Sequence, residues 1–163
     1  MRYIRQPDEI SCGPTAILNA LKWGGMPVTH DDLPKIQFAC KTVNAYDPFD
    51  TENAGTYDHD FDRTLRYAGA PLFDVKRKNS FSFKSVKEHL LSGGAVCIGY
   101  YWVENGKEGA HFAFIEKIEK GYWVTINDHS SSSAVKRRVE KTVRKWLTSR
   151  KMGCPSVWFL TRK

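Results

Sequence analysis

Apolar residues in the first part of the chain recur at the spacing of an α-helix. Ile17, Leu18 and Leu21 form one apolar stripe in a segment that begins near Cys12 and ends at the pair Gly24-Gly25. Similar stripes and cap residues indicate three further helices, so that helices are expected over residues 12–24, 30–40, 57–67 and 82–91.

After Gly94 the pattern changes from helical to extended. Short segments rich in aromatic and β-branched residues, each bounded by Gly or Asn, predict strands over Ala95–Val103, Ala110–Ile118, Tyr122–Asn127 and Ser156–Leu160. Helices followed by antiparallel strands indicate an α+β fold, in which an N-terminal helical half packs on a C-terminal antiparallel β-sheet. The length, 163 residues without a repeat or a Pro/Ser-rich linker, predicts a single domain over residues 1–163.

The net charge of +7 is concentrated near the C-terminus. Residues 136–151 carry eight basic side chains against Glu140 alone. A basic run can bind nucleic acid, but Val139, Val143, Trp146 and Leu147 recur at helical spacing within it. We therefore expect a helix with one buried stripe and a solvated basic face, which would favour an acidic partner; nucleic acid is not the expected ligand.

The sequence offers no signal for a membrane, a metal or a cofactor. No stretch approaches the roughly 20 apolar residues that cross a bilayer, and the N-terminus lacks a secretory or transit pattern, which predicts a cytoplasmic protein. The four cysteines have no CxxC spacing, so neither a zinc site nor a redox pair is expected. Cys40 and Cys97 have the neighbours of buried, unreactive thiols.

Cys12 has the features of a nucleophilic thiol. It lies at the expected start of a helix, where the positive end of the helix dipole lowers the pKa of a thiol. Gln6, six residues earlier, can donate a hydrogen bond to an oxyanion together with the backbone N–H of Cys12. Gly13 would leave room for a substrate beside the backbone, and we assign it to substrate binding.

His111 and Asp128 supply a candidate base and its orienting group. If Glu119-Lys120 forms the turn of a hairpin, His111 pairs with Asp128, and cross-strand neighbours at that separation allow a carboxylate to orient an imidazole. Gly121 suggests a bulge that would shift the register by one residue and favour Asn127 instead. Either side chain would complete a Cys-His-Asp or Cys-His-Asn triad.

Together these residues resemble the C39-like cysteine peptidases of the papain-like superfamily, which cleave after Gly-Gly in bacteriocin leaders. The resemblance implies a papain-like fold, with Cys12 as nucleophile, His111 as general base and acid, Asp128 as orienting residue and Gln6 as oxyanion donor. It rests on segments that span nearly the whole chain: Gln6 with Cys12-Gly13-Pro14, Gly55-Thr56, Leu90-Leu91-Ser92-Gly93-Gly94, His111-Phe112-Ala113-Phe114-Ile115 and Val124-Thr125-Ile126-Asn127-Asp128.

Three functions are compatible with these residues. The leading hypothesis is a cysteine peptidase that hydrolyses peptide or isopeptide bonds of a protein or peptide substrate, with Gly-Gly as a candidate cleavage motif. The second is an acyltransferase or transglutaminase, in which an amine replaces water in the same thiol chemistry. The third is a non-catalytic protein that binds through the basic helix. The first two need a thiol within hydrogen-bond reach of His111.

Overall fold

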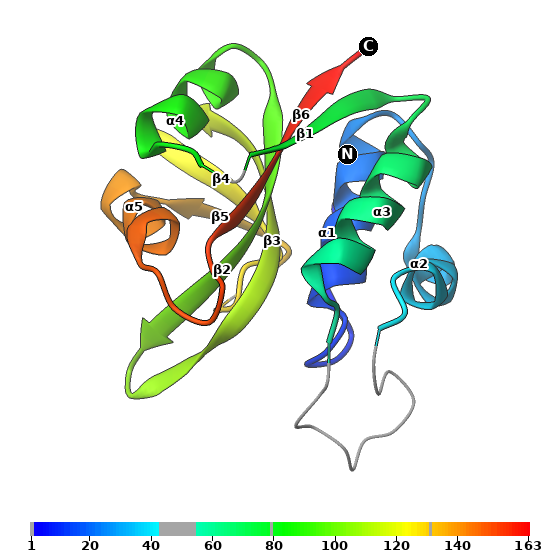
Figure 1. Ribbon diagram of the computed structural model, residues 1–163, viewed down its shortest axis with the longest axis horizontal. Coiled ribbons are helices and arrows are strands. Elements are labelled where there is room, and N and C mark those ends of the chain that lie inside the picture. The colour runs from blue at the N-terminus through cyan, green and yellow to red at the C-terminus, as the bar shows by residue number, and fades with distance from the viewer. Residues whose placement is uncertain (1, 43–54, 79, 131) are drawn as a thin grey trace.

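The computed structural model describes residues 2–42, 55–78, 80–130 and 132–163. Within these ranges the chain forms five α-helices, one 3₁₀ turn and a six-stranded antiparallel sheet, which confirms the α+β class. Helices α1 (Cys12–Trp23), α2 (Leu33–Ala39) and α3 (Asp58–Gly69) lie on one face of the sheet, and α4 (Phe83–Leu91) and α5 (Glu140–Thr148) lie on the other (Figure 1). The sheet is therefore covered on both faces, rather than on one as the sequence suggested.

The expected helices of the N-terminal part are present. The first, α1 (Cys12–Trp23), ends at Gly24 and Gly25, as predicted. The second begins with the 3₁₀ turn η1 (His30–Asp32), which Thr29 caps, and continues as α2 (Leu33–Ala39). The third, α3 (Asp58–Gly69), buries Phe61 and Leu65, whereas Tyr57 precedes the helix and is 53% exposed.

The sheet contains the four expected strands and two that the sequence did not reveal. Its order is β1-β6-β2-β3-β4-β5, so the two unexpected strands, β1 and β5, are its edges. Both are short and carry mostly exposed, basic side chains. The strands are β1 (Phe73–Lys78), β2 (Ala95–Glu104), β3 (Lys107–Glu119), β4 (Tyr122–Ile126), β5 (Val135–Arg138) and β6 (Ser156–Arg162).

The central strands alternate between two hydrophobic cores. On β2, Cys97 packs with the α1–α3 layer, whereas Val96 and Ile98 pack under α4 (Phe83–Leu91) and α5 (Glu140–Thr148). Because successive side chains of a strand point to opposite faces, a strand covered on both sides reads as a continuous apolar run. This explains the run from Ala95 to Tyr101, which is buried throughout.

The basic segment is half strand and half helix. Val143, Trp146 and Leu147 form the buried stripe of α5, as expected. Val139 precedes that helix and is 53% exposed, because the preceding residues belong to β5 and the helix begins only at Glu140. Five of the eight basic residues of the segment therefore lie outside α5.

The register of the β3–β4 hairpin differs from both predicted registers. Its turn is Lys120-Gly121, where both residues have positive φ (51° and 80°), as a two-residue turn of type I′ requires. A register shift between Ile115 and Lys117 then places Phe114 opposite Ile126. Strand pairing stops at that point, so His111 has no cross-strand partner on β4.

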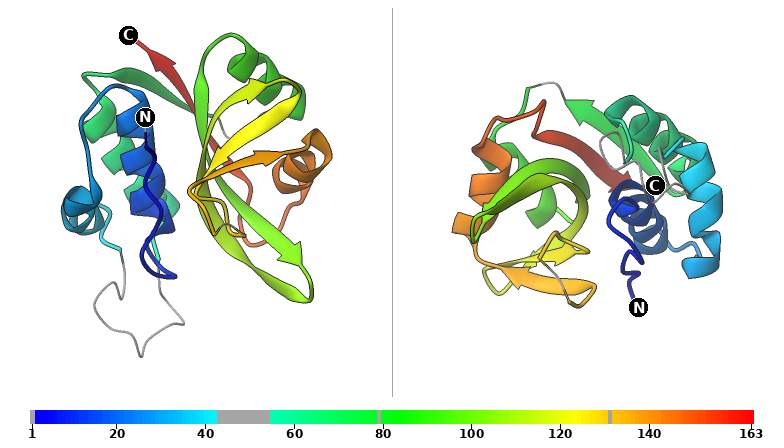
Figure 2. Two further views of the ribbon diagram at one scale, coloured as in Figure 1. Left: turned by 180° about the vertical axis from the view of Figure 1, so that it is seen from behind. Right: turned by 90° about the horizontal axis from the view of Figure 1, so that it is seen from below.

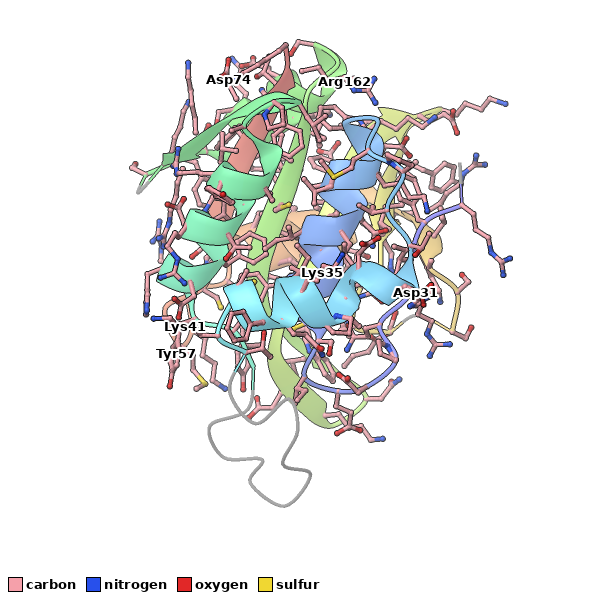
Figure 3. All side chains as sticks on the ribbon, turned by 90° about the vertical axis from the view of Figure 1, so that its right-hand side faces the viewer. Asp31, Lys35, Lys41, Tyr57, Asp74 and Arg162 are labelled. Atoms are coloured by element: carbon pink, nitrogen blue, oxygen red, sulfur yellow. The ribbon has the colours of Figure 1, made fainter. Side chains whose placement is uncertain are left out.

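Helices α1 and α3 begin at the same end of the helical layer (Figure 1). Figure 3 shows Tyr57, at the start of α3, at the opposite end of the helical layer from Asp74 and Arg162. The view from behind shows that the N-terminal segment runs beside α1 before it turns into that helix at the end where α3 also begins (Figure 1 and Figure 2). No helix among the described residues is long and apolar enough to cross a membrane.

Candidate active site

Cys12 is the first residue of α1, and a short turn fixes its position. The carboxylate of Asp8 accepts hydrogen bonds from the backbone N–H of Ile10 (2.9 Å) and of Ser11 (2.8 Å), and from the Ser11 hydroxyl (2.8 Å). The buried side chain of Gln37, on α2, donates to the same hydroxyl at 2.8 Å. Four hydrogen bonds therefore hold the turn that leads into the helix, and with it the thiol.

The sulfur of Cys12 lies in a site that favours the thiolate. Burial by itself would raise the pKa of this thiol, but the charge of His111 and a hydrogen bond to its ring outweigh burial. Backbone hydrogen bonds from Phe112 and Gly13 also reach the sulfur. The pKa of Cys12 therefore lies below the ordinary thiol value, as a nucleophilic cysteine requires.

His111, on β3, is held by a backbone carbonyl. Its Nε2 lies 2.7 Å from the carbonyl oxygen of Asn127, and because a carbonyl only accepts, Nε2 carries the proton and Nδ1 is free to exchange one with the thiol. Burial lowers the pKa of His111, but the Cys12 thiolate, its hydrogen bond and the Asn127 carbonyl together raise it above the ordinary value. A thiolate–imidazolium pair is thereby favoured.

Asn127 connects this ring to Gln6. The backbone N–H of Gln6 donates to Asn127 Oδ1 (3.0 Å), and Asn127 Nδ2 donates to Gln6 Oε1 (2.7 Å). The side-chain N–H₂ of Gln6 donates to the carbonyl of Asp8 at 2.6 Å, which leaves its second hydrogen for a ligand. One buried residue thus positions the imidazole through its carbonyl and the candidate oxyanion donor through its side chain.

Asp128 does not make the expected hydrogen bond to His111. Its buried carboxylate is taken up by Arg138, with Oδ2 2.8 Å from Nε and Oδ1 2.9 Å from Nη2, and by the Thr125 hydroxyl at 2.8 Å. Burial would raise the pKa of Asp128, but these partners lower it to about 2. The carboxylate acts on His111 only through its charge, and the hydrogen-bonding role predicted for its side chain belongs to the Asn127 main chain.

The position of Gly13 is explained by packing within the chain. A Cβ atom at this residue would lie 2.8 Å from the side chain of Thr56, just before α3, and such a contact is too close for any other residue. Gly13 is buried and lines neither cleft of the site. The space that was expected to admit a substrate is therefore filled by Thr56, and the backbone N–H of Gly13 serves the Cys12 sulfur instead.

Two clefts meet at His111. One, of about 420 Å³, is lined by Cys12, Thr56, Tyr57, Met152 and Cys154 among others. The other, of about 580 Å³, is lined by Gln6, Trp102, Asn127 and His129 among others. Ala110 and His111 line both. An extended chain that lies across His111 can thus occupy both clefts while it passes the sulfur.

Aromatic side chains support His111 from behind, and sequence reasoning missed them. Tyr100, on β2, packs edge-on against the His111 ring (5.8 Å between centroids) and hydrogen-bonds Nδ1 of His129 through its hydroxyl (2.9 Å). His129 in turn stacks on Trp102 (4.3 Å) and bonds Glu104 (2.9 Å). The sequence signal was weak, because aromatic residues at alternate positions of a strand also occur in any buried sheet.

The remaining cysteines lack the environment of Cys12. Burial raises the pKa of Cys40 to about 12 and raises that of Cys97 further, as predicted for structural thiols. Cys154 lines the Cys12 cleft, but burial raises its pKa to about 11. No group of three or more potential metal ligands occurs among the described residues.

Comparison with known proteins does not assign the chain. Neither a scan against models of protein families nor a search of curated proteins returns a match.

Proposed function

We propose that this protein is a cysteine peptidase with a papain-like fold, related to the C39-like group, that hydrolyses peptide or isopeptide bonds. The observation that carries the proposal is the environment of Cys12. At the first residue of a helix, its sulfur is hydrogen-bonded to His111 and to two backbone N–H groups, and its pKa is lowered despite burial. The N-terminal end of a helix and an adjacent imidazolium are the two features that activate a thiol for attack on a carbonyl.

In the proposed reaction the Cys12 thiolate attacks the scissile carbonyl carbon and forms a C–S bond. The negative charge that develops on the oxygen is stabilised by the second side-chain hydrogen of Gln6 and by the backbone N–H of Cys12, which as a first-turn N–H has no partner within the helix. His111 protonates the leaving amine, and the C–N bond breaks. His111 then removes a proton from water, which attacks the thioester and releases the acid and the thiolate.

Each supporting residue has a defined part in this reaction. Asn127 keeps the His111 ring and the Gln6 amide in position, and the Asp128 carboxylate adds negative charge near the imidazolium. The two clefts that meet at His111 would hold the chain on either side of the scissile bond. A substrate cleaved after Gly-Gly, as in the C39-like group, is the first candidate.

The chemistry also favours a reducing compartment. All four cysteines are free thiols, and the proposed nucleophile must stay reduced to react. We therefore propose that the protein works in the cytoplasm.

The proposal is tested by replacing Cys12 and by ranking the reactivity of the thiols. Cys12→Ala should remain folded and lose hydrolysis of Gly-Gly-containing peptides, whereas Cys97→Ala, which removes a buried thiol elsewhere, should retain it. Iodoacetamide should label Cys12 ahead of Cys40 and Cys97 in the folded protein, as read by mass spectrometry. Equal labelling of the three thiols, or full activity of Cys12→Ala, would contradict the mechanism. Conjugates formed in preference to free acid with an added amine would indicate an acyltransferase.

A further inference from the structure

His129 lies beside the candidate active site and has a partner on each ring nitrogen. Its side chain, in the loop between β4 and β5, is only 5% exposed. Nδ1 lies 2.9 Å from the hydroxyl oxygen of Tyr100, and Nε2 lies 2.9 Å from a carboxylate oxygen of Glu104. Trp102 stacks on the ring (4.3 Å between centroids), and Trp146, on α5, packs against it at a steep angle (5.5 Å and 77°). Four side chains therefore hold this imidazole in one orientation.

These partners determine which nitrogen of His129 carries the proton. The Glu104 carboxylate can only accept a hydrogen bond, so the proton is on Nε2. Burial lowers the pKa of His129 and the charge of His111 lowers it further, whereas Glu104 and Asp128 raise it without overcoming this effect. The ring is therefore neutral at neutral pH, and its Nδ1 accepts the hydroxyl hydrogen of Tyr100. The other charged residues around His129, among those that the structure describes, line one of two pockets with it: Arg138, Lys141 and Lys145 in one, and Arg5, Asp8 and Glu9 in the other.

Tyr100 connects His129 to His111. Its side chain is fully buried, and burial raises the pKa of the phenol well above its ordinary value, so the hydroxyl keeps its proton. The hydroxyl oxygen also accepts a hydrogen bond from the backbone N–H of His129 at 3.1 Å. Both hydrogen bonds of the phenol thus involve one residue. The phenol ring stacks on Trp146 (4.5 Å between centroids) and packs against the His111 ring (5.8 Å, with an interplanar angle of 72°).

The ring of His111 depends on this packing for its tilt. Its Nε2 donates to the carbonyl of Asn127 at 2.7 Å, and the ring is also hydrogen-bonded to the sulfur of Cys12. An imidazole held at two points can still rock about the line that joins them. Tyr100 limits that movement because it packs against the ring, and His129 in turn fixes Tyr100.

We propose that Tyr100 and His129 are positioning residues that aim the His111 imidazolium at the leaving amine. The inference rests on the proposed peptidase function and adds to it two residues that act through His111. The C–N bond of an amide breaks only when its nitrogen receives a proton, so a tilt that misdirects this proton slows the cleavage. An aryl ester whose leaving group departs as a stable anion needs no such proton. Loss of either positioning residue should therefore affect amides selectively.

The test compares two substrates that share one acyl group. They are the p-nitroanilide and the p-nitrophenyl ester of a peptide that ends in Gly-Gly. With the protein in excess, release of p-nitroaniline or p-nitrophenol in a single turnover reports formation of the thioester at Cys12, before water takes part. Cys12→Ala corrects for spontaneous hydrolysis of the ester.

Two variants remove the contact between Tyr100 and His129 from either side. Tyr100→Phe and His129→Leu should each slow release of p-nitroaniline about five- to hundredfold, because each leaves a buried polar group unpaired and frees the phenyl or phenol ring to move. Release of p-nitrophenol should stay within about twofold of wild type. The double variant should be no slower than the slower single variant, since the two residues act as a unit.

A rescue variant and a matched control separate positioning from general packing. In His129→Asn the side-chain oxygen can accept the Tyr100 hydroxyl in place of Nδ1, and release of p-nitroaniline should return to within about twofold of wild type. Tyr101→Phe removes a hydroxyl from the next residue of β2, whose side chain points to the other face and lies under Lys151. It should leave both rates unchanged. Thermal unfolding checks that each variant is folded.

A measurement on the wild-type protein does not depend on how the variants fold. The ring ¹⁵N chemical shifts of His129 at neutral pH should show a protonated Nε2 and an unprotonated Nδ1, with the signals assigned by their absence in His129→Asn. A proton on Nδ1, alone or together with one on Nε2, would overturn the inference.

The outcomes distinguish the positioning role from the function on which it rests. Equal slowing of anilide and ester, or slowing of neither, in folded Tyr100→Phe and His129→Leu would overturn the positioning role and leave the peptidase proposal standing. The same conclusion would follow if His129→Asn were as slow as His129→Leu, or if Tyr101→Phe showed the same selective loss. A folded wild-type protein that forms no thioester with either substrate would contradict the proposed function and this inference with it.

Discussion

Replacing Asn127 with glycine should separate the two tasks of this residue. Asn127 has φ of 54°, in the left-handed region that glycine adopts freely. The Asn127→Gly variant therefore keeps the backbone conformation and the carbonyl that holds His111, and it removes only the side chain that holds Gln6. Alanine would be a less informative replacement, because it would add strain of roughly 1–2 kcal/mol at the same φ.

The size of the effect follows from the hydrogen bonds that are lost. Asn127 makes two of them to Gln6, one with its backbone N–H and one with its side-chain amide, and each contributes about 0.5–1.5 kcal/mol, so that Gln6 loses about 1–3 kcal/mol of positioning. If that positioning acts only in the transition state, kcat should fall about five- to hundredfold. Removing the donor entirely in Gln6→Ala should cost about a hundred- to thousandfold, which sets the upper limit.

Two assays read the two tasks. Hydrolysis of a Gly-Gly peptide reports on the oxyanion donor, whereas the rate and pH profile of iodoacetamide alkylation report on the Cys12–His111 pair. Asn127→Gly should slow hydrolysis and leave alkylation within about twofold of wild type, because the thiolate and its imidazolium are retained. The double variant with Gln6→Ala should be no slower than Gln6→Ala alone, since the side chain acts through Gln6.

Either of two results would contradict this division of tasks between the carbonyl and the side chain of Asn127. If Asn127→Gly slowed alkylation as much as hydrolysis, the side chain would be supporting the ion pair and not the oxyanion donor. If the losses of the two single variants multiplied in the double variant, the two residues would be acting independently.

Four further predictions concern the thiol and its surroundings. Hydrolysis should follow a bell-shaped pH profile. Its acid limb should lie below the ordinary thiol pKa of 9.0, because the pKa of Cys12 is lowered, and its alkaline limb should lie above the ordinary imidazole pKa of 6.5, because the pKa of His111 is raised. Activity that appears only above pH 9.0 would contradict the ion pair. Arg138→Ala should lower the free energy of unfolding by about 3–5 kcal/mol in urea titrations, because it leaves the buried Asp128 carboxylate without its main partner. A loss under about 1 kcal/mol would be inconsistent with that pairing. In wild type, stability from this carboxylate should be present above its unfolded pKa of 3.8 and be lost as the pH falls toward the folded value of about 2, an effect of about 2 kcal/mol. The melting temperature of Gly13→Ala should be several degrees lower than that of the wild type, because the added Cβ would lie 2.8 Å from the Thr56 side chain. Changing Thr56 to glycine in the same variant should restore most of the loss. An unchanged melting temperature in Gly13→Ala would contradict the packing.

Local signals explain which elements could be predicted from the sequence. The start and end of α1 follow from Pro14 and the Gly24-Gly25 pair, whose backbone preferences act on their own residues and do not depend on distant contacts. Strands β2, β3, β4 and β6 were evident because they are buried and therefore rich in aromatic and β-branched residues.

The two edge strands, β1 and β5, could not be recognised by their content of aromatic and β-branched residues. In β1 only Phe73 is buried and Val75 is half-buried, and the other four residues are charged; β5 consists of one Val followed by Lys and Arg. Edge strands need little apolar surface, and exposed charges there discourage pairing with other chains. The same charges hide such strands from a search for hydrophobic alternation, and in β5 they led to the prediction of a longer basic helix.

Neighbouring residues encode helix termini and buried strands, and for this reason the position of Cys12 at the start of a helix and of His111 on a strand could be predicted locally. The group that orients the imidazole depends instead on contacts between distant parts of the folded chain. The β-bulge near Ile115 and the left-handed conformation of Asn127 turn a backbone carbonyl toward the ring, and Arg138 takes up the carboxylate of Asp128. Every residue has a carbonyl, so no side-chain pattern can reveal which one will serve as the acceptor.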